Sequence, residues 1–279
     1  MVTSTSKFIV KVVLYAGLAL VALAQIFPLI WMFNFSLLKS GDFFGSYILK
    51  WPEPFQWKNY SDAFNFGHVP AYLLNSVIVT VVVIAVTVVV SLMLSYVIAR
   101  IDWKWNKYLA GLVMICMIVP IYATLLPNFF IFTNTKLIDT YLALILPNIA
   151  FMIPISVFIF MGFMQTTPRA IEEAAVIDGL NLLGVVFRII FPISKPVIAS
   201  VTVLTFMSTW NEFIMAVTYI RSDSFKTLPF SLIQFTGQYA SNYGAQFAVM
   251  TIIALPSVLL YMLFTEQITN SLTAGAVKG

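Results

Sequence analysis

The segment Glu173–Gly179 combines acidic, small and flexible residues in an order that suits docking to another protein. It reads Glu-Ala-Ala-Val-Ile-Asp-Gly, and nine residues separate Gly179 from Ile189-Ile190-Phe191-Pro192. Alanine side chains let a groove of another protein approach a helix closely, and Gly179 permits the left-handed turn that commonly ends a helix. The pattern predicts a contact element rather than a group that reacts.

The flanking residues predict where this docking helix begins and which face it presents. Thr167 is expected as the N-cap and Pro168 at the first helical position. Glu172 and Glu173 follow early enough to complement the helix dipole. The residues that fall at three- and four-residue spacing on one face are Ile171, Ala174, Ala175 and Asp178.

A second short helix is expected to begin near Asn181 and to run to Pro192, with Pro196 opening the next apolar run. The two helices would form an L-shaped element over residues 165–195. An amphipathic connector lying on the membrane is the alternative, and Glu-Ala-Ala alone would favour it because such tripeptides are common on helices. The full spacing favours the two-helix element.

Metal and covalent chemistry find little support in the sequence. Cys116 is the single cysteine and lies within an apolar run, which excludes an intrachain disulfide and a thiolate metal site. His68 is also alone, and one imidazole cannot build a metal site. Neither H-E-x-x-H, G-x-S-x-G nor the phosphate loop G-x-x-x-x-G-K-[ST] occurs. The sequence therefore argues against an intramembrane enzyme and offers no phosphate loop of its own for a nucleotide.

The composition requires that the docking helix be held by membrane-spanning helices. Hydrophobic residues make up 61% of the chain and charged residues 9%, whereas soluble domains carry about 25% charged residues. The mean hydropathy is +0.95. Backbone groups in lipid must be bonded internally, so apolar runs of this length predict an all-α integral membrane protein.

Six spans emerge when charged and loop residues are taken as boundaries, and the chain reads as one membrane domain over residues 1–279. The expected spans are 8–33, 69–99, 108–132, 141–164, 196–220 and 243–268. The first run also resembles a signal peptide after Lys7 and Lys11, but its charge-free stretch is too long for one, so a retained helix is expected. The polar interruptions Asn34–His68 and Arg221–Asn242 are either docking surfaces for an external partner or ordered loops that cap helices.

The distribution of Lys and Arg predicts that both termini are cytoplasmic. The nine residues then inside are Lys7, Lys11, Arg100, Lys104, Lys107, Arg169, Arg188, Lys195 and Lys278, and the six outside are Lys39, Lys50, Lys58, Lys136, Arg221 and Lys226. The excess follows the positive-inside rule and places the element over residues 165–195 in the cytoplasm. The net charge of +4 is explained by these loops and calls for no nucleic acid.

Glu212 is the one acid expected in the interior of a span. Such a group must face a cavity or a partner, which makes it a candidate functional residue. A structural hydrogen bond to another helix, through Asn211, is an equally weighted alternative. Further polar candidates for a translocation path are Tyr122, Asn128, Asn148 and Asn211.

The segment 173–192 resembles the cytoplasmic "EAA" loop of ABC importer membrane subunits, and only Phe191 departs from the usual Leu. The resemblance covers essentially the whole chain and narrows to the carbohydrate-uptake family that includes the maltose and multiple-sugar systems. The supporting segments are Leu74-Asn75-Ser76, Ile138-Asp139-Thr140-Tyr141, Leu144-Ile145-Leu146-Pro147, Trp210-Asn211-Glu212-Phe213 and Leu272-Thr273-Ala274-Gly275-Ala276-Val277-Lys278-Gly279. The last segment is similar to the ending of the second membrane subunit in such systems.

The resemblance implies the type I ABC importer permease fold in a prokaryotic plasma membrane. It also implies three kinds of partner: a second, different permease subunit, a cytoplasmic ATPase dimer that holds ATP and Mg²⁺, and an extracellular sugar-binding protein. The residues that it implies for ATPase coupling are Glu172, Glu173, Ala174, Ala175, Asp178 and Gly179, with Gly275, Val277, Lys278 and Gly279 of the tail. This chain would carry no cofactor and would form half of the pore, which opens by alternating access.

The substrate class is expected to be an oligosaccharide. A phosphorylated substrate such as glycerol phosphate is the alternative within the family, although no span carries an Arg or Lys in its interior to pair with a phosphate. An ion-coupled secondary transporter is a weaker alternative, because such proteins usually carry clusters of intramembrane charges. Here Glu212 is the one acid in the interior of a span.

Overall fold

The computed structural model describes residues 4–43, 50–236 and 242–276, and within these ranges it contains helices and no strand. The chain divides into two compact units. Unit 1 comprises Met1–Val69 and Ser231–Ala254, and unit 2 comprises Pro70–Phe230 and Leu255–Gly279. The single domain expected over residues 1–279 therefore remains a prediction.

Unit 1 is built mainly from two long apolar helices and one short helix. Its elements are α1 (Ser4–Ser36), η1 (Ser40–Asp42), α2 (Lys58–Phe66), the end of η4 (Leu228–Phe235) and the first part of α12 (Tyr243–Ala276). Every residue of α1 from Phe8 to Ile30 is exposed. An apolar surface of this extent needs lipid or another protein to cover it.

The core of unit 1 is aromatic and lies at the C-terminal end of α1. The Phe35 ring lies 4.2 Å from Trp31 and 5.4 Å from Phe247, and Phe43 stacks on Phe247 at 5.6 Å. The buried Asn59 amide of α2 donates to the backbone carbonyls of Ser36 and Leu38, each at 2.8 Å. These contacts join α1, α2 and α12 within the unit.

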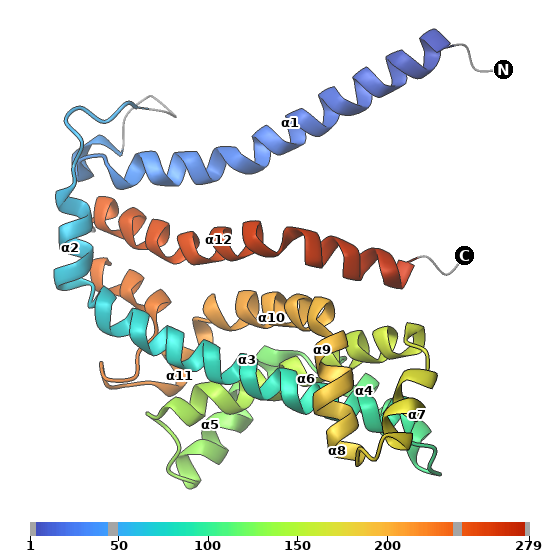
Figure 1. Ribbon diagram of the computed structural model, residues 1–279. Coiled ribbons are helices and arrows are strands. Elements are labelled where there is room, and N and C mark those ends of the chain that lie inside the picture. The colour runs from blue at the N-terminus through green and yellow to red at the C-terminus, as the bar shows by residue number, and fades with distance from the viewer. Residues whose placement is uncertain (1–3, 44–49, 237–241, 277–279) are drawn as a thin grey trace. The chain divides into compact units, whose positions relative to one another are not determined.

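Unit 2 contains the remaining helices, and Figure 1 shows their order along the chain. They are α3 (Val69–Arg100), α4 (Asn106–Cys116), η2 (Ile121–Thr124), α5 (Leu125–Asn134), α6 (Tyr141–Thr166), α7 (Ala170–Ile177), α8 (Leu182–Gly184), the π-helical η3 (Val185–Ile190), α9 (Phe191–Ile193), α10 (Lys195–Trp210) and α11 (Ile214–Tyr219). The valine-rich α3 is helical despite its β-branched residues, because a lone strand could not satisfy its backbone groups in lipid.

Four of the expected spans are continuous helices and two are broken. The continuous ones are Phe8–Ser36, Val69–Arg100, Tyr141–Thr166 and Tyr243–Thr265. The third span is not one helix as expected, because Asn106–Cys116 and Ile121–Asn134 meet at 90°. Pro120 lies at that bend and cannot donate a backbone hydrogen bond.

The fifth span begins as expected but stops at Trp210 and resumes at Ile214. A second bend of 79° separates Leu182–Ile193 from Lys195–Trp210. Length and composition therefore allow up to six spans if each bent pair counts as one.

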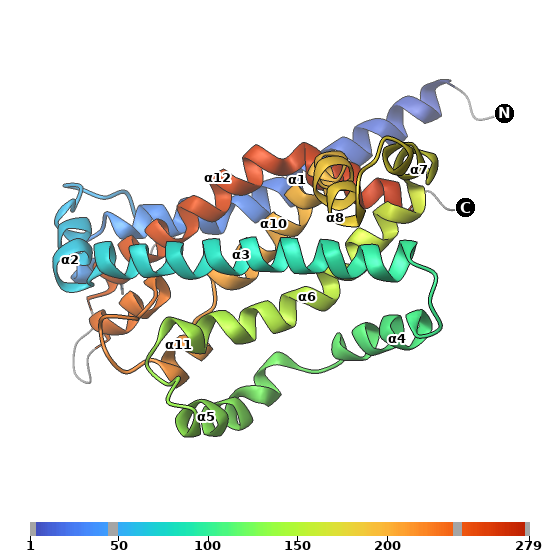
Figure 2. The same cartoon turned by 60° about the horizontal axis from the view of Figure 1, so that its bottom comes forward.

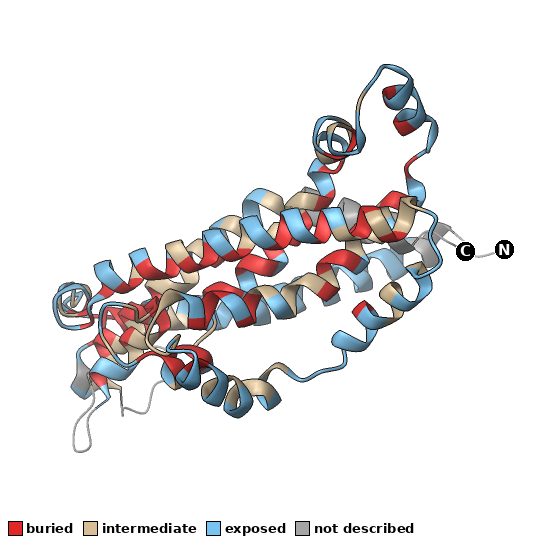
Figure 3. Ribbon diagram, turned by 90° about the horizontal axis from the view of Figure 1, so that it is seen from below, coloured by how far each residue is buried: buried red, intermediate tan, exposed pale blue. Residues whose placement is uncertain are grey.

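Two hydrophobic clusters hold unit 2 together, one toward each end of α3. One cluster joins α3, α6, η3 and α10 through Leu92, Phe160, Ile190 and Val201. The other joins α3, α6 and α11 through Val83, Leu144 and Met215. Figure 3 shows buried and exposed residues alternating along the long helices, as expected for helices that pack on one side.

Candidate functional site

The helix α7 contains the Glu-Ala-Ala segment, and its start differs from the expected one. The helix begins at Ala170, and Thr167 is the C-cap of the preceding α6 instead of the N-cap of α7. The Thr167 hydroxyl donates to the carbonyl of Phe163 at 3.2 Å, so it is turned back toward α6. The Pro168 ring therefore lies in the connection between the two helices, outside α7.

The end of α7 agrees with the prediction for Gly179. Its φ is +86°, and it follows the C-cap Asp178. The Leu180 N–H donates to Ala175 O at 3.0 Å and the Gly179 N–H to Val176 O at 3.0 Å, which is the Schellman pairing. No atom lies within 4 Å of a Cβ built on Gly179, so backbone strain alone disfavours a side chain there.

Glu172 points into the protein, because it forms an ion pair with Arg100 at the C-terminal end of α3. The Arg100 Nε lies 2.7 Å from Glu172 Oε1, and the two side chains are only 8% and 10% exposed. Arg100 Nη2 also donates to the Thr167 carbonyl at 2.7 Å, and the Tyr96 hydroxyl hydrogen-bonds Glu172. These four residues are called the Arg100 joint below.

The rest of α7, apart from Ala175, is exposed and partly apolar. The Ile177 side chain is 85% exposed and Val176 is 58% exposed. Glu173, Ala174 and Asp178 are also exposed. The expected grouping of Ile171, Ala174, Ala175 and Asp178 on one docking face was wrong for Ala175, which is buried and packs with Leu180.

The second short helix begins near Asn181, as predicted. The Asn181 Oδ1 accepts the Gly184 N–H at 2.8 Å and caps α8. The segment continues through η3 and α9. A surface groove of about 420 Å³ runs along it and is lined by Gly179, Leu180, Asn181, Leu183, Gly184, Phe187 and Arg188.

Glu212 lies in the break between α10 and α11, where its carboxylate caps α11. The carboxylate accepts the Met215 N–H at 2.9 and 3.1 Å and the Ala216 N–H at 3.3 Å. The Asn211 amide donates to Met207 O instead of joining Glu212 to another helix. The carboxylate thus satisfies backbone N–H groups that the break leaves open.

The other candidates for the path divide into two groups. Asn148 and Asn128 lie close to α11, because the Asn148 amide is 4.0 Å from Met215 Sδ and Asn128 hydrogen-bonds Tyr219. Glu212 caps the same helix, so the structure brings these three candidates together. Tyr122 is 54% exposed in η2, and neither it nor Asn211 has a described contact with that group.

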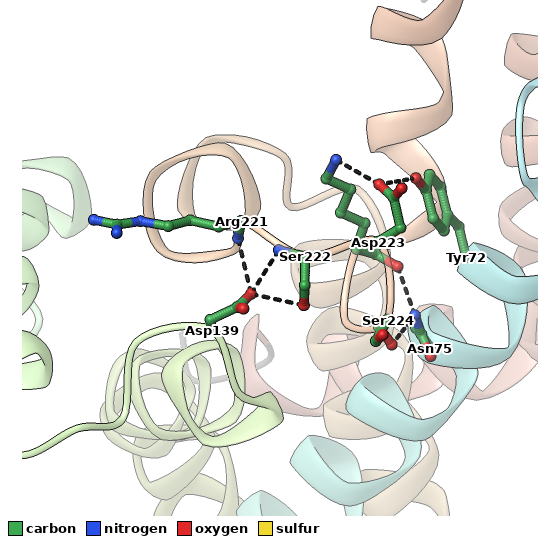
Figure 4. Close-up of polar contacts among 8 residues, drawn as sticks. Tyr72, Asn75, Asp139, Arg221, Ser222, Asp223 and Ser224 are labelled. Carbon is green, nitrogen blue, oxygen red and sulfur yellow. Dashed lines mark hydrogen bonds and ion pairs between the residues drawn. The ribbon is translucent and has the colours of Figure 1, made fainter.

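A second polar cluster lies at the N-terminal end of α3 and is drawn in Figure 4. Asp139 Oδ1 accepts the Arg221 N–H at 2.9 Å, the Ser222 N–H at 2.8 Å and the Ser222 hydroxyl at 3.0 Å. Burial alone would raise the pKa of Asp139, but the hydrogen bonds from Ser222 and Arg221 outweigh it and lower that pKa below its usual value. The residue has a φ of 63° and its N–H donates to Tyr219 O at 3.0 Å.

Three residues of α3 bind the chain that follows Ser222. The Asn75 amide donates to the carbonyls of Ser224 at 3.0 Å and Lys226 at 2.8 Å. The Tyr72 hydroxyl donates to Asp223 at 3.0 Å, and the Ser76 hydroxyl accepts the Leu228 N–H at 2.8 Å. Asp139 and these three residues, with Arg221–Leu228, are called the Asp139 clamp below.

Sequence reasoning cited Asn75, Ser76 and Asp139 only as marks of resemblance and did not predict the clamp or the pairing of Arg100. Arg100 could have been noticed, because it is the last residue of a long apolar run and a charge there needs a partner. The tail residues Val277, Lys278 and Gly279 lie outside the described residues. Gly275 lies within α12, near its end.

Residues 91–273 match the family model described as "Binding-protein-dependent transport system inner membrane component". The chain belongs to this family. It is 32% identical to the probable ABC transporter permease protein YurM of Bacillus subtilis, with 94% of this chain and 86% of that protein covered. It is 30% identical to the trehalose/maltose transport system permease protein MalG of Thermococcus litoralis, with 96% and 97% covered.

The fold agrees with this membership. The structure matches a chain in the crystal structure of a bacterial ABC transporter involved in the import of the acidic polysaccharide alginate, with a TM-score of 0.79. The match covers 95% of this chain and 98% of that chain at 18% identity. The chain is therefore a multi-pass permease with the ABC importer permease fold, as the loop spacing predicted.

Proposed function

We propose that this permease imports a carbohydrate of the oligosaccharide class. Transport proceeds by alternating access and is driven by a separate ATPase. The observation that carries the coupling half of the proposal is the exposed apolar end of α7. Ile177 and Val176 are exposed while Glu172 on the same helix is buried. A rigid helix with one side fixed and an apolar side free is suited to sit in a groove of a partner.

The proposal places α7 and both termini in the cytoplasm of a prokaryote. The bias of Lys and Arg toward that side supports this orientation. It puts the Arg100 joint on the cytoplasmic side and the Asp139 clamp outside. The positions agree with a cytoplasmic ATPase at α7 and an external binding protein near the polar loops.

The partners follow from the same reasoning. A second, different permease subunit would complete the pore, and the exposed length of α1 from Phe8 to Ile30 supports a protein or lipid neighbour there. ATP and Mg²⁺ would be held by the ATPase dimer. The residues of the tail, Gly275 with Val277 to Gly279, would contact that dimer.

The carbohydrate class rests on the named relatives and on the sequence. MalG is named for trehalose and maltose transport. The path candidates around α11 are two amides and a carboxylate, which suit hydroxyl-rich ligands. Glycerol phosphate is the alternative, and uptake of a panel containing maltose, trehalose, raffinose and glycerol phosphate by cells that carry the importer separates the two.

The coupling proposal is tested by three variants of α7 in the whole importer. Ile177→Asp, Glu173→Lys and Gly179→Val should insert normally but lose ATPase attachment or uptake by at least tenfold. The loss is expected in Gly179→Val because Gly179 has a left-handed backbone conformation. A residue with a Cβ is strained there by about 1–2 kcal/mol. Lys107→Glu is the control, because it reverses a charge on an exposed side chain of α4, outside α7.

Attachment is measured by pull-down, hydrolysis in lipid vesicles and uptake on the same preparations. Wild-type levels of all three in the Ile177→Asp and Glu173→Lys variants would refute α7 as the coupling element. An equal loss in Lys107→Glu would show that charge reversal elsewhere on the proposed cytoplasmic side is equally damaging, and the assignment to α7 would fall.

A further inference from the structure

The helix α3 is the longest uninterrupted helix in unit 2. It has 32 residues and no proline beyond its first turn. The other long described helices contain internal prolines, at Pro28 in α1, Pro147 and Pro154 in α6, and Pro256 in α12. Figure 2 shows α3 running straight across unit 2. A helix with every internal backbone bond intact resists bending more than one with a proline.

The C-terminal end of α3 is fixed to the docking helix by the Arg100 joint. Arg100 binds both the Glu172 carboxylate and the Thr167 carbonyl. Arg100 therefore contacts both the first turn of α7 and the connection between α6 and α7. A displacement of α7 must either move α3 or break a buried ion pair.

The N-terminal end of α3 is fixed to Arg221–Leu228 by the Asp139 clamp. Asn75, Tyr72 and Ser76 make four hydrogen bonds to that segment, of 2.8 to 3.0 Å. From Ser76 to Arg100 the helix extends roughly 36 Å at 1.5 Å per residue. The two attachments thus lie at opposite ends of one rigid element.

The middle of α3 is held differently. Thr80 and Thr87 are buried, yet their hydroxyls have no hydrogen-bond partner among the described residues. One interhelical bond is recorded there, from Ser91 to Ile153 O at 3.4 Å. The remaining contacts of the middle are apolar, through Val83, Val88 and Leu92. Apolar contacts have no fixed direction and permit small sliding movements.

We propose that α3 is a connecting rod that carries movement of α7 to the segment Arg221–Leu228, with Arg100 and Glu172 as the positioning residues of its joint. The inference rests on the proposed function, because it takes α7 as the helix that the ATPase moves. The partner-facing loop at the far end would then respond to nucleotide through this one helix.

The test follows two reporters in the whole importer, purified through a tag on this chain and placed in lipid vesicles. Cys116 is first replaced by Ser, so that one new cysteine carries a fluorescent label. The first reporter is Leu182→Cys beside α7, and the second is Ser224→Cys in the clamp, where only the backbone carbonyl of Ser224 is used. The probe is ATP with Mg²⁺, which requires no knowledge of the transported molecule.

In the wild-type background both labels should change on adding ATP with Mg²⁺. In Glu172→Gln the Leu182 label should still respond, while the response of the Ser224 label falls at least fivefold. In Arg100→Lys the response of the Ser224 label should fall less than in Glu172→Gln. Lysine keeps the positive charge, although it loses the two-pronged contact of the guanidinium group. Lys107→Gln removes a charge from an exposed side chain of α4, outside the joint, and should behave as wild type.

A second pair of variants tests the stiffness of α3 without touching the joint. Val81→Gly with Val82→Gly alters two exposed positions, and Val81→Ala with Val82→Ala is the matched control. The glycine pair should lower the Ser224 response at least twofold, and the alanine pair should not. Glycine adds backbone freedom in a helix, which alanine does not.

The outcomes separate the rod from the proposed function. A full Ser224 response in Glu172→Gln with the complex intact would overturn the rod, and so would equal responses in the glycine and alanine pairs. No response of the Leu182 label in wild type would instead overturn the role of α7. If Glu172→Gln fails to assemble, Arg100→Lys and the glycine pair decide the question.

Discussion

The two ends of α3 are held by different chemistry. At its C-terminal end, Arg100 and Glu172 join through charged side chains that are nearly buried. At its N-terminal end, Asn75 and Asp139 bind mostly backbone groups of Arg221–Leu228. The Arg100 joint therefore depends on the identity of both paired side chains. The Asp139 clamp depends mostly on the residues that bind Arg221–Leu228 and less on the side chains of that segment.

The difference bears on what each end can tolerate. A buried charge without its partner is costly, so neither Arg100 nor Glu172 can change alone. Backbone carbonyls and N–H groups are present whatever the side chain, so Ser224 can change without loss of the bond from Asn75. The clamp can hold a segment whose side chains remain available for an external partner, whereas the joint cannot.

The largest expected effect is at the joint. Glu172→Ala and Arg100→Ala should each lower the free energy of unfolding by about 3–5 kcal/mol, because each leaves a buried charge unpaired. The double variant should lose clearly less than the sum of the two. Denaturant unfolding in detergent measures all three. If the losses of unfolding free energy in the two single variants add up in the double variant, Arg100 and Glu172 do not stabilise each other. The contrast between the joint and the clamp would then not hold.

An intermediate effect is expected at Asn75. Asn75→Leu leaves two backbone carbonyls and the Tyr141 hydroxyl without their bonds, which should lower the free energy of unfolding by about 1–3 kcal/mol. Ser224→Ala is the matched control and should be neutral, since only its carbonyl is used. If Ser224→Ala lowers the free energy of unfolding as much as Asn75→Leu does, the clamp depends on the Ser224 side chain and not only on its carbonyl.

The smallest effect is expected at Asp139, where it depends on pH. Its pKa is lowered in the folded protein, so its contribution to stability is present above the ordinary pKa of about 4 and is lost as pH falls through the lowered value. Thermal unfolding of wild type and Asp139→Asn should therefore differ at pH 7 and converge in acid. A difference that persists at the lowest pH would assign the effect to shape and not to charge.

The sequence predicted the elements better than their attachments. Composition and the run lengths predicted the helices, and the φ of Gly179 was expected from its place after Glu-Ala-Ala. The 90° bend of the third span was missed because only charged and loop residues were taken as boundaries, and Pro120 lies within an apolar run. The break at Asn211–Phe213 was missed because no proline or glycine marks it.

The contacts of the site were harder to predict, because they join residues far apart in the chain. Arg100 and Glu172 are separated by 72 positions, and Asp139 and Ser222 by 83. No local pattern reports such pairs. Glu172 was assigned to ATPase coupling from the resemblance, and its burial against Arg100 became visible only with the fold. The coupling role of the exposed residues stays a prediction.

The exposure of α1 has a consequence for how the protein is made. Its 29-residue stretch Phe8–Ser36 is predominantly apolar, and apart from the position of Pro28 its backbone bonds are made within the helix itself. Such a segment is stable in a bilayer without any tertiary neighbour. It can therefore enter the membrane while the rest of the chain is still on the ribosome, and it anchors the nascent polypeptide before the later helices emerge.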